Sequence, residues 1–400
     1  MPLTTIPLKI IMIKLFLLIV SLLSFFVHAD NEQRKSSTSS ASYGVSNIIP
    51  EWTPDLRDEE IKLKAQKGDF IAVPIPVVDP TIGTGLVVAG AYYHSQSAGE
   101  RASQPASATQ VVAAYTNNDS YAYGLIQKNY WQQDTWRFVS TAAYVALKLT
   151  LIDSQYSEDG SQLDWNIEGT LIKSELLRRF DENWYLGGQI RLINNKQTFS
   201  GKVEGEAFDQ ANDPDTKEDS DIAKANGLGL LVQYDSRDSQ TNPYKGQRFE
   251  FDALLNSTSI GSTKTYQSFN LRYRYYHQLA NPLVLSLETK GCAKSGHAPL
   301  WDYCTIGLRG FSATSYLDKT SFSAQSELRW RAWHDLGLVA FAGIGYNARS
   351  IAQLGDNNSV NSYGLGLRYM LLESQRINFR VDYARSGDDN ALYVSVAEAF

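Results

Sequence analysis

The chain has 400 residues and a formal net charge of −6 at pH 7, so we expect no overall basic surface for nucleic acid. Hydrophobic residues make up 43% of the chain. No second apolar run of about 18 residues follows the N-terminal one, which excludes an α-helical inner-membrane protein. The 12% aromatic content, with 23 Tyr and 8 Trp, fits the aromatic girdles of a membrane barrel, but soluble β-sandwiches are also rich in tyrosine.

Residues 1–29 are predicted to be a secretory signal. Lys9 and Lys14 precede an apolar run over residues 15–27, and Val27-His28-Ala29 supplies a small-residue cleavage pattern. A basic stretch, an apolar stretch and such a site are the three parts of an export signal. The alternative is a permanent membrane helix, but the run is short for one, and no cysteine follows the site to carry a lipid anchor.

Residues 30–68 are predicted to be a mobile periplasmic linker. Residues 36–40 are a low-complexity Ser/Thr stretch, and residues 57–67 are charged, with room for at most one short helix.

Apolar and polar residues alternate with a period of two through residues 69–400, which indicates β-strands. Clear examples are residues 269–276, 322–330, 363–371 and 377–383. A soluble sandwich would put the apolar faces inward and the charged faces in water. Here such segments recur along nearly the whole chain, and no stretch could supply helices to cover a sheet. Lipid outside and a polar lumen inside satisfy both faces, and closure leaves no exposed edge in the bilayer. The sequence therefore predicts an all-β fold, a transmembrane antiparallel β-barrel of the bacterial outer membrane.

Segments between turn signals give about sixteen strands, with both ends of the barrel in the periplasm. The predicted strands start near Asp69, Thr84, Thr109, Tyr121, Thr135, Leu163, Trp184, Gly227, Gln247, Tyr266, Leu283, Phe322, Gly337, Tyr363, Ile377 and Ala391. Short connections are expected in the periplasm and long ones outside the cell. Residues 95–108 do not fit this alternation of short and long connections: they fall on the periplasmic side but are too long for a periplasmic turn.

The first predicted strand contains Pro74 and Pro76, which lie two residues apart and so remove two N–H donors from the same edge. The other edge keeps the N–H groups of Val73, Ile75 and Val77 and should pair with the second strand. Prolines in strands are tolerated where ladder bonds are not required.

The impaired edge should face the last strand, which we expect to end in Phe400. The seam between residues 71–78 and 392–400 is therefore predicted to be short, strained or slightly open. A proline-stiffened entry to an ordinary barrel is the alternative. A terminal aromatic residue on an alternating strand resembles the signal read by the outer-membrane assembly machinery, although Glu398 interrupts the apolar face.

Cys292 and Cys304 are the only cysteines, and both lie in the same predicted loop. An even number of cysteines in an exported chain implies a disulfide. Closing a loop of this size contributes about 3 kcal/mol on the entropic account, mostly to the order of the loop.

Two motifs carry a resemblance to a known family. Asp235, Arg237 and Asp238, followed by Pro243 and Gly246, resemble a D-x-R-D…P-x-x-G turn. Leu308-Arg309-Gly310-Phe311 resembles a (V/I)-R-G-(F/Y) motif. Over residues 226–400 the chain thus resembles the bacterial surface antigen domain, the barrel of the superfamily that contains BamA, TamA and the two-partner secretion translocators. The resemblance implies that the motif lies on a long loop, between strands 11 and 12, that folds back into the lumen.

In that family the motif arginine pairs with an acidic residue on the barrel wall, and Glu327 matches that position. A second acidic partner usually lies in an F-x-D-x-G segment. Here residues 341–345 have Gly343 in place of the aspartate, so we expect a loop held by one carboxylate. The alternative is that Arg309 is an ordinary loop residue in solvent.

Family members that insert or translocate proteins carry periplasmic POTRA domains, and residues 30–68 have no room for one. The resemblance thus implies the barrel and leaves the assembly activity unsupported. No enzyme is expected, because His94, His277, His297 and His334 are scattered and no motif places a nucleophile beside a base. No metal site and no cofactor are expected either.

Acidic residues in the predicted outer loops include Asp119, Asp153, Glu158 and the run over residues 213–221. They could hold divalent cations that bridge lipopolysaccharide, although solvated loops are the simpler interpretation. The expected partners are the lipid bilayer and lipopolysaccharide. Three functions stay open: a barrel that inserts or transports client proteins with a separately encoded periplasmic partner, a gated or passive pore for small solutes, and a surface antigen without transport.

Overall fold

The computed structural model describes residues 68–79, 82–151, 163–203, 206–209, 222–311, 316–355, 359–372, 376–387, 389–396 and 398–400. The predicted signal, and the predicted linker except Gly68, lie outside the described residues. So do Asp153, Glu158 and residues 213–221 of the acidic loops.

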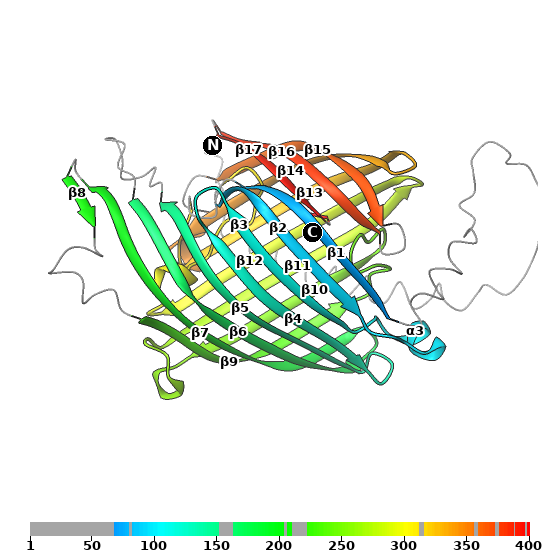
Figure 1. Ribbon diagram of the computed structural model, residues 1–400, viewed down its shortest axis with the longest axis horizontal. Coiled ribbons are helices and arrows are strands. Elements are labelled where there is room, and N and C mark those ends of the chain that lie inside the picture. The colour runs from blue at the N-terminus through cyan, green and yellow to red at the C-terminus, as the bar shows by residue number, and fades with distance from the viewer. Residues whose placement is uncertain are drawn as a thin grey trace, which may run out of the picture. The chain divides into compact units, whose positions relative to one another are not determined.

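The described residues are almost all strand (Figure 1). The strands are β1 (Asp69–Asp79), β2 (Gly83–Tyr93), β3 (Ala108–Thr116), β4 (Tyr121–Trp131), β5 (Trp136–Leu151), β6 (Leu163–Asp181), β7 (Trp184–Val203), β8 (Glu206–Asp209), β9 (Ile222–Asp235), β10 (Gly246–Asn256), β11 (Tyr266–Ala280), β12 (Leu283–Gly296), β13 (Thr320–Trp333), β14 (Leu336–Ala348), β15 (Val360–Leu372), β16 (Ile377–Ser386) and β17 (Asp389–Val396). They form one sheet of 17 strands, in which β8 is a short extension paired with β7. The other strands make a closed antiparallel barrel of 16, which confirms the predicted fold.

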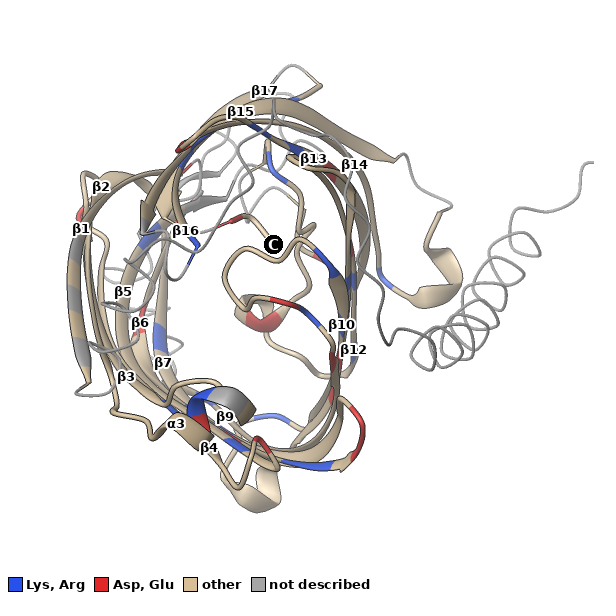
Figure 2. Ribbon diagram, turned by 90° about the vertical axis from the view of Figure 1, so that its right-hand side faces the viewer, with Lys and Arg blue, Asp and Glu red and all other residues tan. Residues whose placement is uncertain are grey.

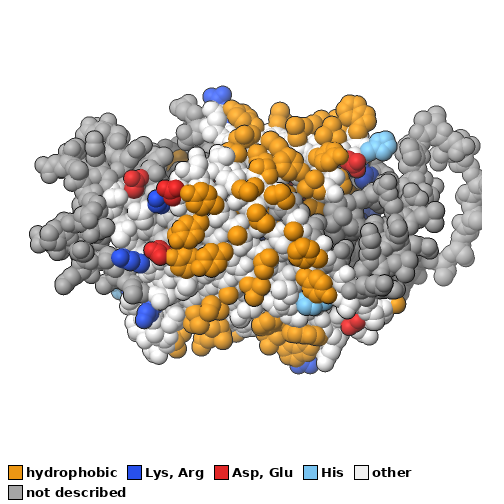
Figure 3. All heavy atoms as spheres, in the orientation of Figure 1, with side chains coloured by type: hydrophobic (Ala, Val, Ile, Leu, Met, Phe, Trp, Pro, Cys, Tyr) orange, Lys and Arg blue, Asp and Glu red, His pale blue; other side chains and the backbone are white. Residues whose placement is uncertain are grey.

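Alternation along each strand separates the two faces of the barrel wall. In β13, Leu328 and Trp330 are 39% and 49% exposed, whereas Glu327 and Arg329 are 0% and 7% exposed. Figure 3 shows the outer face, where hydrophobic side chains gather across the middle and charged ones lie toward the two ends. This is the arrangement that a hydrocarbon layer outside and a polar interior require.

The connection between β2 and β3 is the one that was too long for a periplasmic turn. It contains the helix α3 (Ala98–Ser103), which the sequence analysis did not predict. Ser97 and Glu100 cap this helix reciprocally, each side chain accepting a hydrogen bond from the other residue's backbone N–H. Among the described residues, no helix is long and apolar enough to cross a membrane.

The barrel closes at a short seam between β1 and β17. The only registered pair there, among the described residues, is Val78 with Val394. By contrast, β1 pairs with β2 from Asp69 to Asp79 without interruption. β17 ends at Val396, so the expectation that the last strand runs to Phe400 was wrong.

Seen along the barrel, part of the chain lies inside the ring of strands (Figure 2). Beside it, a cavity of about 1510 Å³ is lined by strands from β1 to β13. The interior is therefore partly filled and partly open.

Candidate functional site

The chain between β12 and β13, residues 297–319, is called the β12–β13 loop below; residues 312–315 are outside the described part. Its first half is held against the wall by Asp302. The Asp302 carboxylate lies 2.7 Å from Arg191 of β7 and 3.3 Å from Lys294 of β12, and it accepts a hydrogen bond from the Tyr266 hydroxyl of β11 at 2.6 Å. Burial raises the pKa of Asp302, but Arg191 and Lys294 outweigh this and hold the pKa below its usual value.

A disulfide joins Cys292 on β12 to Cys304 in the β12–β13 loop. The Cα atoms are 5.7 Å apart, which is ordinary disulfide geometry. The sequence predicted this pair, and the structure confirms it. Because Cys304 follows Asp302 by two residues, the disulfide and the Asp302 ion pairs secure the same part of the loop.

Leu308, Gly310 and Phe311 place the motif against the wall. Leu308 and Phe311 are buried in one apolar cluster with Ile306. Gly310 has a φ of +110°, a conformation that L side chains rarely adopt, and its N–H donates to the Tyr393 hydroxyl of β17 at 2.8 Å. Glycine at 310 therefore permits the turn that aims the neighbouring Arg309 side chain.

Arg309 is buried and binds two carboxylates. Its guanidinium lies 2.6 Å from Glu327 of β13 and 2.7 Å from Asp382 of β16. Its central carbon lies 3.4 Å from the centre of the Phe341 ring, and its carbonyl oxygen accepts a hydrogen bond from the Ser362 hydroxyl. Both carboxylates are fully buried, so their negative charges are compensated by Arg309 and not by water. The structure thus brings Arg309 and Glu327 together and does not place Arg309 in solvent.

The second carboxylate was not expected. Sequence analysis predicted a loop held by Glu327 alone, because Gly343 stands where an aspartate would be. The structure supplies Asp382 from β16 instead. At Gly343 there is no room for a side chain, since an added Cβ would lie 2.7 Å from the Leu308 side chain and 3.0 Å from the Ala324 carbonyl oxygen. The motif loop itself therefore occupies the space that an aspartate at 343 would need.

Two more arginines extend this arrangement. Arg329 of β13 lies 2.7 Å from Glu327, and Arg368 of β15 lies 2.5 Å from Asp382. Glu398 joins them, 2.7 Å from Arg368 and 3.8 Å from Arg329. We call the six residues the lumen network: Arg309, Arg329, Arg368, Glu327, Asp382 and Glu398. It connects the loop, three strands and the tail that follows β17.

The tail corrects the interpretation of Phe400 and Glu398. Phe400 does not close the seam: it is buried, its carbonyl oxygen accepts a hydrogen bond from Arg329 at 2.7 Å, and its ring lies 5.6 Å from the same guanidinium. Glu398 does not interrupt the apolar face of a strand: its side chain is buried, 2.7 Å from Arg368. In both cases an arginine in the lumen is the physical reason: Arg368 compensates the Glu398 carboxylate, and Arg329 donates to the Phe400 carbonyl oxygen.

The turn motif lies between β9 and β10. Arg237 forms two hydrogen bonds with the Asp235 carboxylate, at 2.9 and 3.0 Å. Asp238 accepts the backbone N–H of Tyr244 at 2.9 Å and pairs with Arg376 at 2.8 Å, which joins this turn to the one before β16. These bonds give partners to polar groups of the irregular loop between β9 and β10, which has no strand neighbour to supply them.

Pro243 and Gly246 complete the motif. Pro243 is fully buried. Gly246 has a φ of +100°, and an added Cβ would collide with the Ser236 carbonyl oxygen. The turn motif is thus a compact connection, and Asn242 within it accepts a hydrogen bond from Arg329 of the lumen network at 3.4 Å.

Pro74 and Pro76 lie in β1, beside the seam. β1 forms its complete ladder with β2, as expected for the edge that keeps its N–H groups. On the other edge β1 meets β17 at Val78 alone, beyond both prolines. The position of the prolines and the short seam therefore coincide.

Comparison with known proteins decides the family. The chain matches the Omp85 superfamily domain over residues 99–391. It belongs to the Omp85 superfamily. Its barrel is therefore a bacterial outer-membrane barrel. No curated protein has significant sequence similarity to the chain.

Solved structures of Omp85 barrels share the fold. BamA from Haemophilus ducreyi lacking POTRA domains 1-3 is 13% identical, with a TM-score of 0.54, over 83% of this chain and 70% of that one. CdiB from Acinetobacter baumannii is 13% identical, with a TM-score of 0.52, over 83% and 60%. CdiB from Escherichia coli is 10% identical, with a TM-score of 0.54, over 88% and 63%. The chain thus spans less than two thirds of either CdiB.

Within this Omp85 barrel, sequence reasoning found Arg309 and Glu327 but missed the other four members of the network: Arg329, Arg368, Asp382 and Glu398. Asp382 and Arg368 were on the polar faces of alternating strands, which already placed them in the lumen. Glu398 broke the apolar alternation, and that break was the available signal. Which of these charges meet depends on the register of four strands, and a single sequence does not supply it.

Proposed function

We propose that this Omp85 barrel inserts or transports client proteins through the seam between β1 and β17. A separately encoded periplasmic partner would deliver the client. The activity is proposed from the family resemblance, and the short seam is the structural observation that supports it.

A short seam leaves a strand edge available to a client. β1 and β17 share one registered pair, whereas β16 and β17 share a continuous ladder from Phe379 to Ser386. An unpaired backbone group in hydrocarbon costs several kcal/mol, so an added strand would be stabilised at this edge. Addition of a strand to an exposed sheet edge is an established way to bind an extended chain.

The test is a disulfide across the seam. Val78 and Val394 face each other in register, so Val78→Cys with Val394→Cys should oxidise to a crosslink. In cells that depend on the crosslinked protein, folded client barrels in the outer membrane should fall to the level of a null strain. A reductant should restore them.

The matched control places the same crosslink in a complete ladder, with Ile75→Cys and Val87→Cys between β1 and β2. This pair should leave client assembly unchanged. Normal client assembly with the seam fully crosslinked would reject the proposal.

A gated pore for small solutes is the second candidate, because the lumen contains a cavity of about 1510 Å³. The seam crosslink separates the two candidates. A pore should conduct equally well when the seam is crosslinked, whereas client insertion should stop.

A further inference from the structure

The open cavity in the lumen is distinct from the lumen network, none of whose six members lines it. Its lining includes ten Lys or Arg and six Asp or Glu, although the whole chain has a net charge of −6. A positive cavity inside a negative protein needs a physical explanation, because charges of one sign repel one another.

Most of the cavity's charges are compensated in pairs. Lys173 lies 2.5 Å from Glu175, and Arg376 lies 2.8 Å from Asp238. Asp302 binds Arg191 and Lys294, as described above. The first two pairs are balanced. Asp302 serves two cations and leaves one surplus positive charge, but both cations are bound to it.

A larger excess, with less well bound cations, lies on β11 and β12. Glu288 is buried and lies 2.8 Å from Lys290 and 3.0 Å from Arg274. Arg272 reaches the same carboxylate at 3.7 Å, and its side chain is 45% exposed. Arg272 and Lys290 also face each other as a registered cross-strand pair. One carboxylate thus serves three cations, and Arg272 is the least well bound of them.

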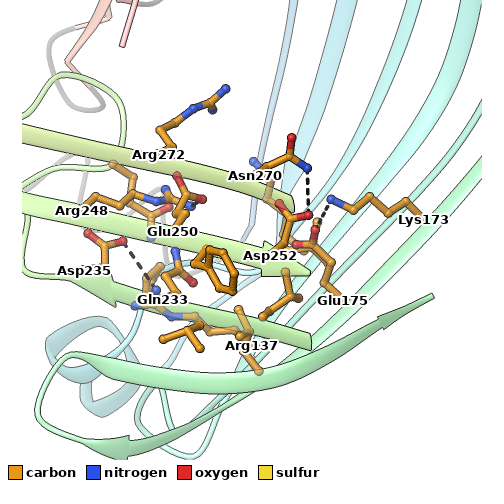
Figure 4. Close-up of a pocket in the computed structure, with 18 of the residues that line it drawn as sticks. Arg137, Lys173, Glu175, Gln233, Asp235, Arg248, Glu250, Asp252, Asn270 and Arg272 are labelled. Atoms are coloured by element: carbon orange, nitrogen blue, oxygen red, sulfur yellow. Dashed lines mark hydrogen bonds and ion pairs between the residues drawn. The ribbon is translucent and has the colours of Figure 1, made fainter. Parts of the chain in front are cut away.

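A second carboxylate does not remove the excess. Glu250 of β10 lies 2.6 Å from Arg248 and faces Arg272 in register. Figure 4 shows Arg248 beside Glu250, and Arg272 extending away from the paired residues. Glu250 and Glu288 together serve Arg248, Arg272, Arg274 and Lys290, so two positive charges are left over.

Lys128 adds a further cation from across the cavity. It lies on β4 and lines the cavity, and in the described part of the chain it has no ion pair. The charged group with which it interacts electrostatically is Arg248, another cation. Lys128 on β4 and Arg248 on β10 therefore repel each other, and no acidic group is paired with Lys128 in the described part of the chain.

We propose that the cavity binds a small soluble anion with phosphate or carboxylate groups. Lys128, Arg248, Arg272 and Lys290, called the basic cluster below, supply the positive charge. A multivalent anion would take up the surplus charge and bridge the two walls. Guanidinium groups suit such ligands because they offer paired N–H donors to phosphate or carboxylate oxygens.

The place and size of the cavity favour a soluble ligand. The barrel strands separate the basic cluster from lipid, so a lipid headgroup in the bilayer does not reach it. A volume of about 1510 Å³ exceeds that of ordinary small-molecule pockets, which leaves room for a hydrated anion. Rings of Arg or Lys are also what selects anions and phosphates in pores.

Lysine acetylation of the folded full-length protein in phosphatidylcholine vesicles tests the proposal, with inorganic pyrophosphate as the probe. Pyrophosphate at about ten times its half-maximal concentration should slow acetylation of Lys128 by about tenfold, because the occupied site shields the amine. Lys148, exposed and paired with Asp119, is an internal control in the same molecule and should react at an unchanged rate. Raised salt should abolish the protection of Lys128.

Variants locate the bound anion. Arg272→Gln should raise the pyrophosphate concentration for half-maximal protection by about tenfold. Arg272→Lys should raise it less, because it keeps the charge and loses only the paired donors, and the control Lys148→Gln should leave it near the native value. Equal protection of Lys128 and Lys148, or none at Lys128, would overturn the proposal. Protection that persists unchanged in Arg272→Gln would also overturn it. If Arg272→Gln does not fold, the native comparison of Lys128 with Lys148 decides the matter by itself.

Discussion

At the scale of single residues, the lumen network shows how charge can be buried inside a barrel. Glu327 and Asp382 are fully buried, yet each carboxylate meets more than one arginine. Glycine is what allows this crowding on β15. An added Cβ at Gly366 would collide with the Asp382 carboxylate, and one at Gly364 would collide with the Phe341 ring beneath Arg309. The Gly-x-Gly spacing of β15 thus makes room for the residues that bind Arg309.

Arg309→Ala should destabilise the protein by about 3–5 kcal/mol, because it leaves two buried carboxylates short of a partner. The β12–β13 loop should become sensitive to protease at the same time. Thermal unfolding and limited proteolysis measure the two effects. Lys148→Ala removes an exposed ion pair and serves as the control, with an expected cost below about 1 kcal/mol. Equal melting temperatures for the two variants would show that Arg309 does not hold the loop.

At the scale of elements, strands were predicted well and the last segment was not. Lipid on one face and the lumen on the other impose a strict alternation, and this alternation located every barrel strand from the sequence. The tail after β17 follows a different rule. Glu398 and Phe400 leave the wall because arginines on β13 and β15 attract them, and contacts of that range are not visible in a local pattern. The same limit hid Asp382, which was assigned to the lumen but not to Arg309.

The β12–β13 loop has two supports near Cys304, and they can be removed separately. Reduction of the disulfide should leave the barrel folded and the loop still held by Asp302. The pKa of Asp302 lies below that of an ordinary aspartate, so the stabilisation that Asp302 gives is present above the ordinary pKa and is lost as the pH falls through the lowered one. Cleavage of the reduced protein within the loop by pepsin should therefore stay slow at pH 4 and rise below it.

Asp302→Asn is the matched variant, since it keeps the shape and removes the charge. After reduction, its loop should be cleaved quickly at every pH. A reduced native protein that is cleaved as fast at pH 4 as the variant would show that Asp302 gives no support. The barrel serves as the reference in both proteins, because its folded form should persist throughout.

At the scale of the whole molecule, the lumen network and the seam are joined by the tail. β17 contributes one registered pair to the seam, and the residues that could extend it turn inward. Continuing the register of Val78 with Val394 would set Pro76 opposite Val396 and Pro74 opposite residue 398. The lumen network thus holds inside the barrel the segment that would lengthen the seam. Pro74 and Pro76 remove N–H donors from the edge of β1 that this segment would otherwise pair with. Both features act in the same direction, toward a barrel whose closure is incomplete along β1.

Glu398→Val should lengthen the seam. The substitution restores the apolar alternation of Leu392, Val394 and Val396, and it removes the carboxylate that binds Arg368. The tail should then continue β17 along β1, where its backbone groups gain partners in hydrocarbon. Hydrogen exchange of the amides over residues 395–400 should slow, and insertion of client barrels should fall.

Glu398→Gln is the control, because a polar side chain can still accept the hydrogen bond from Asn378 and keep the tail inside. Unchanged exchange in Glu398→Val would show that the network does not set the length of the seam. Slower exchange with normal client insertion would instead show that the network sets the length of the seam but that client insertion does not depend on a short seam.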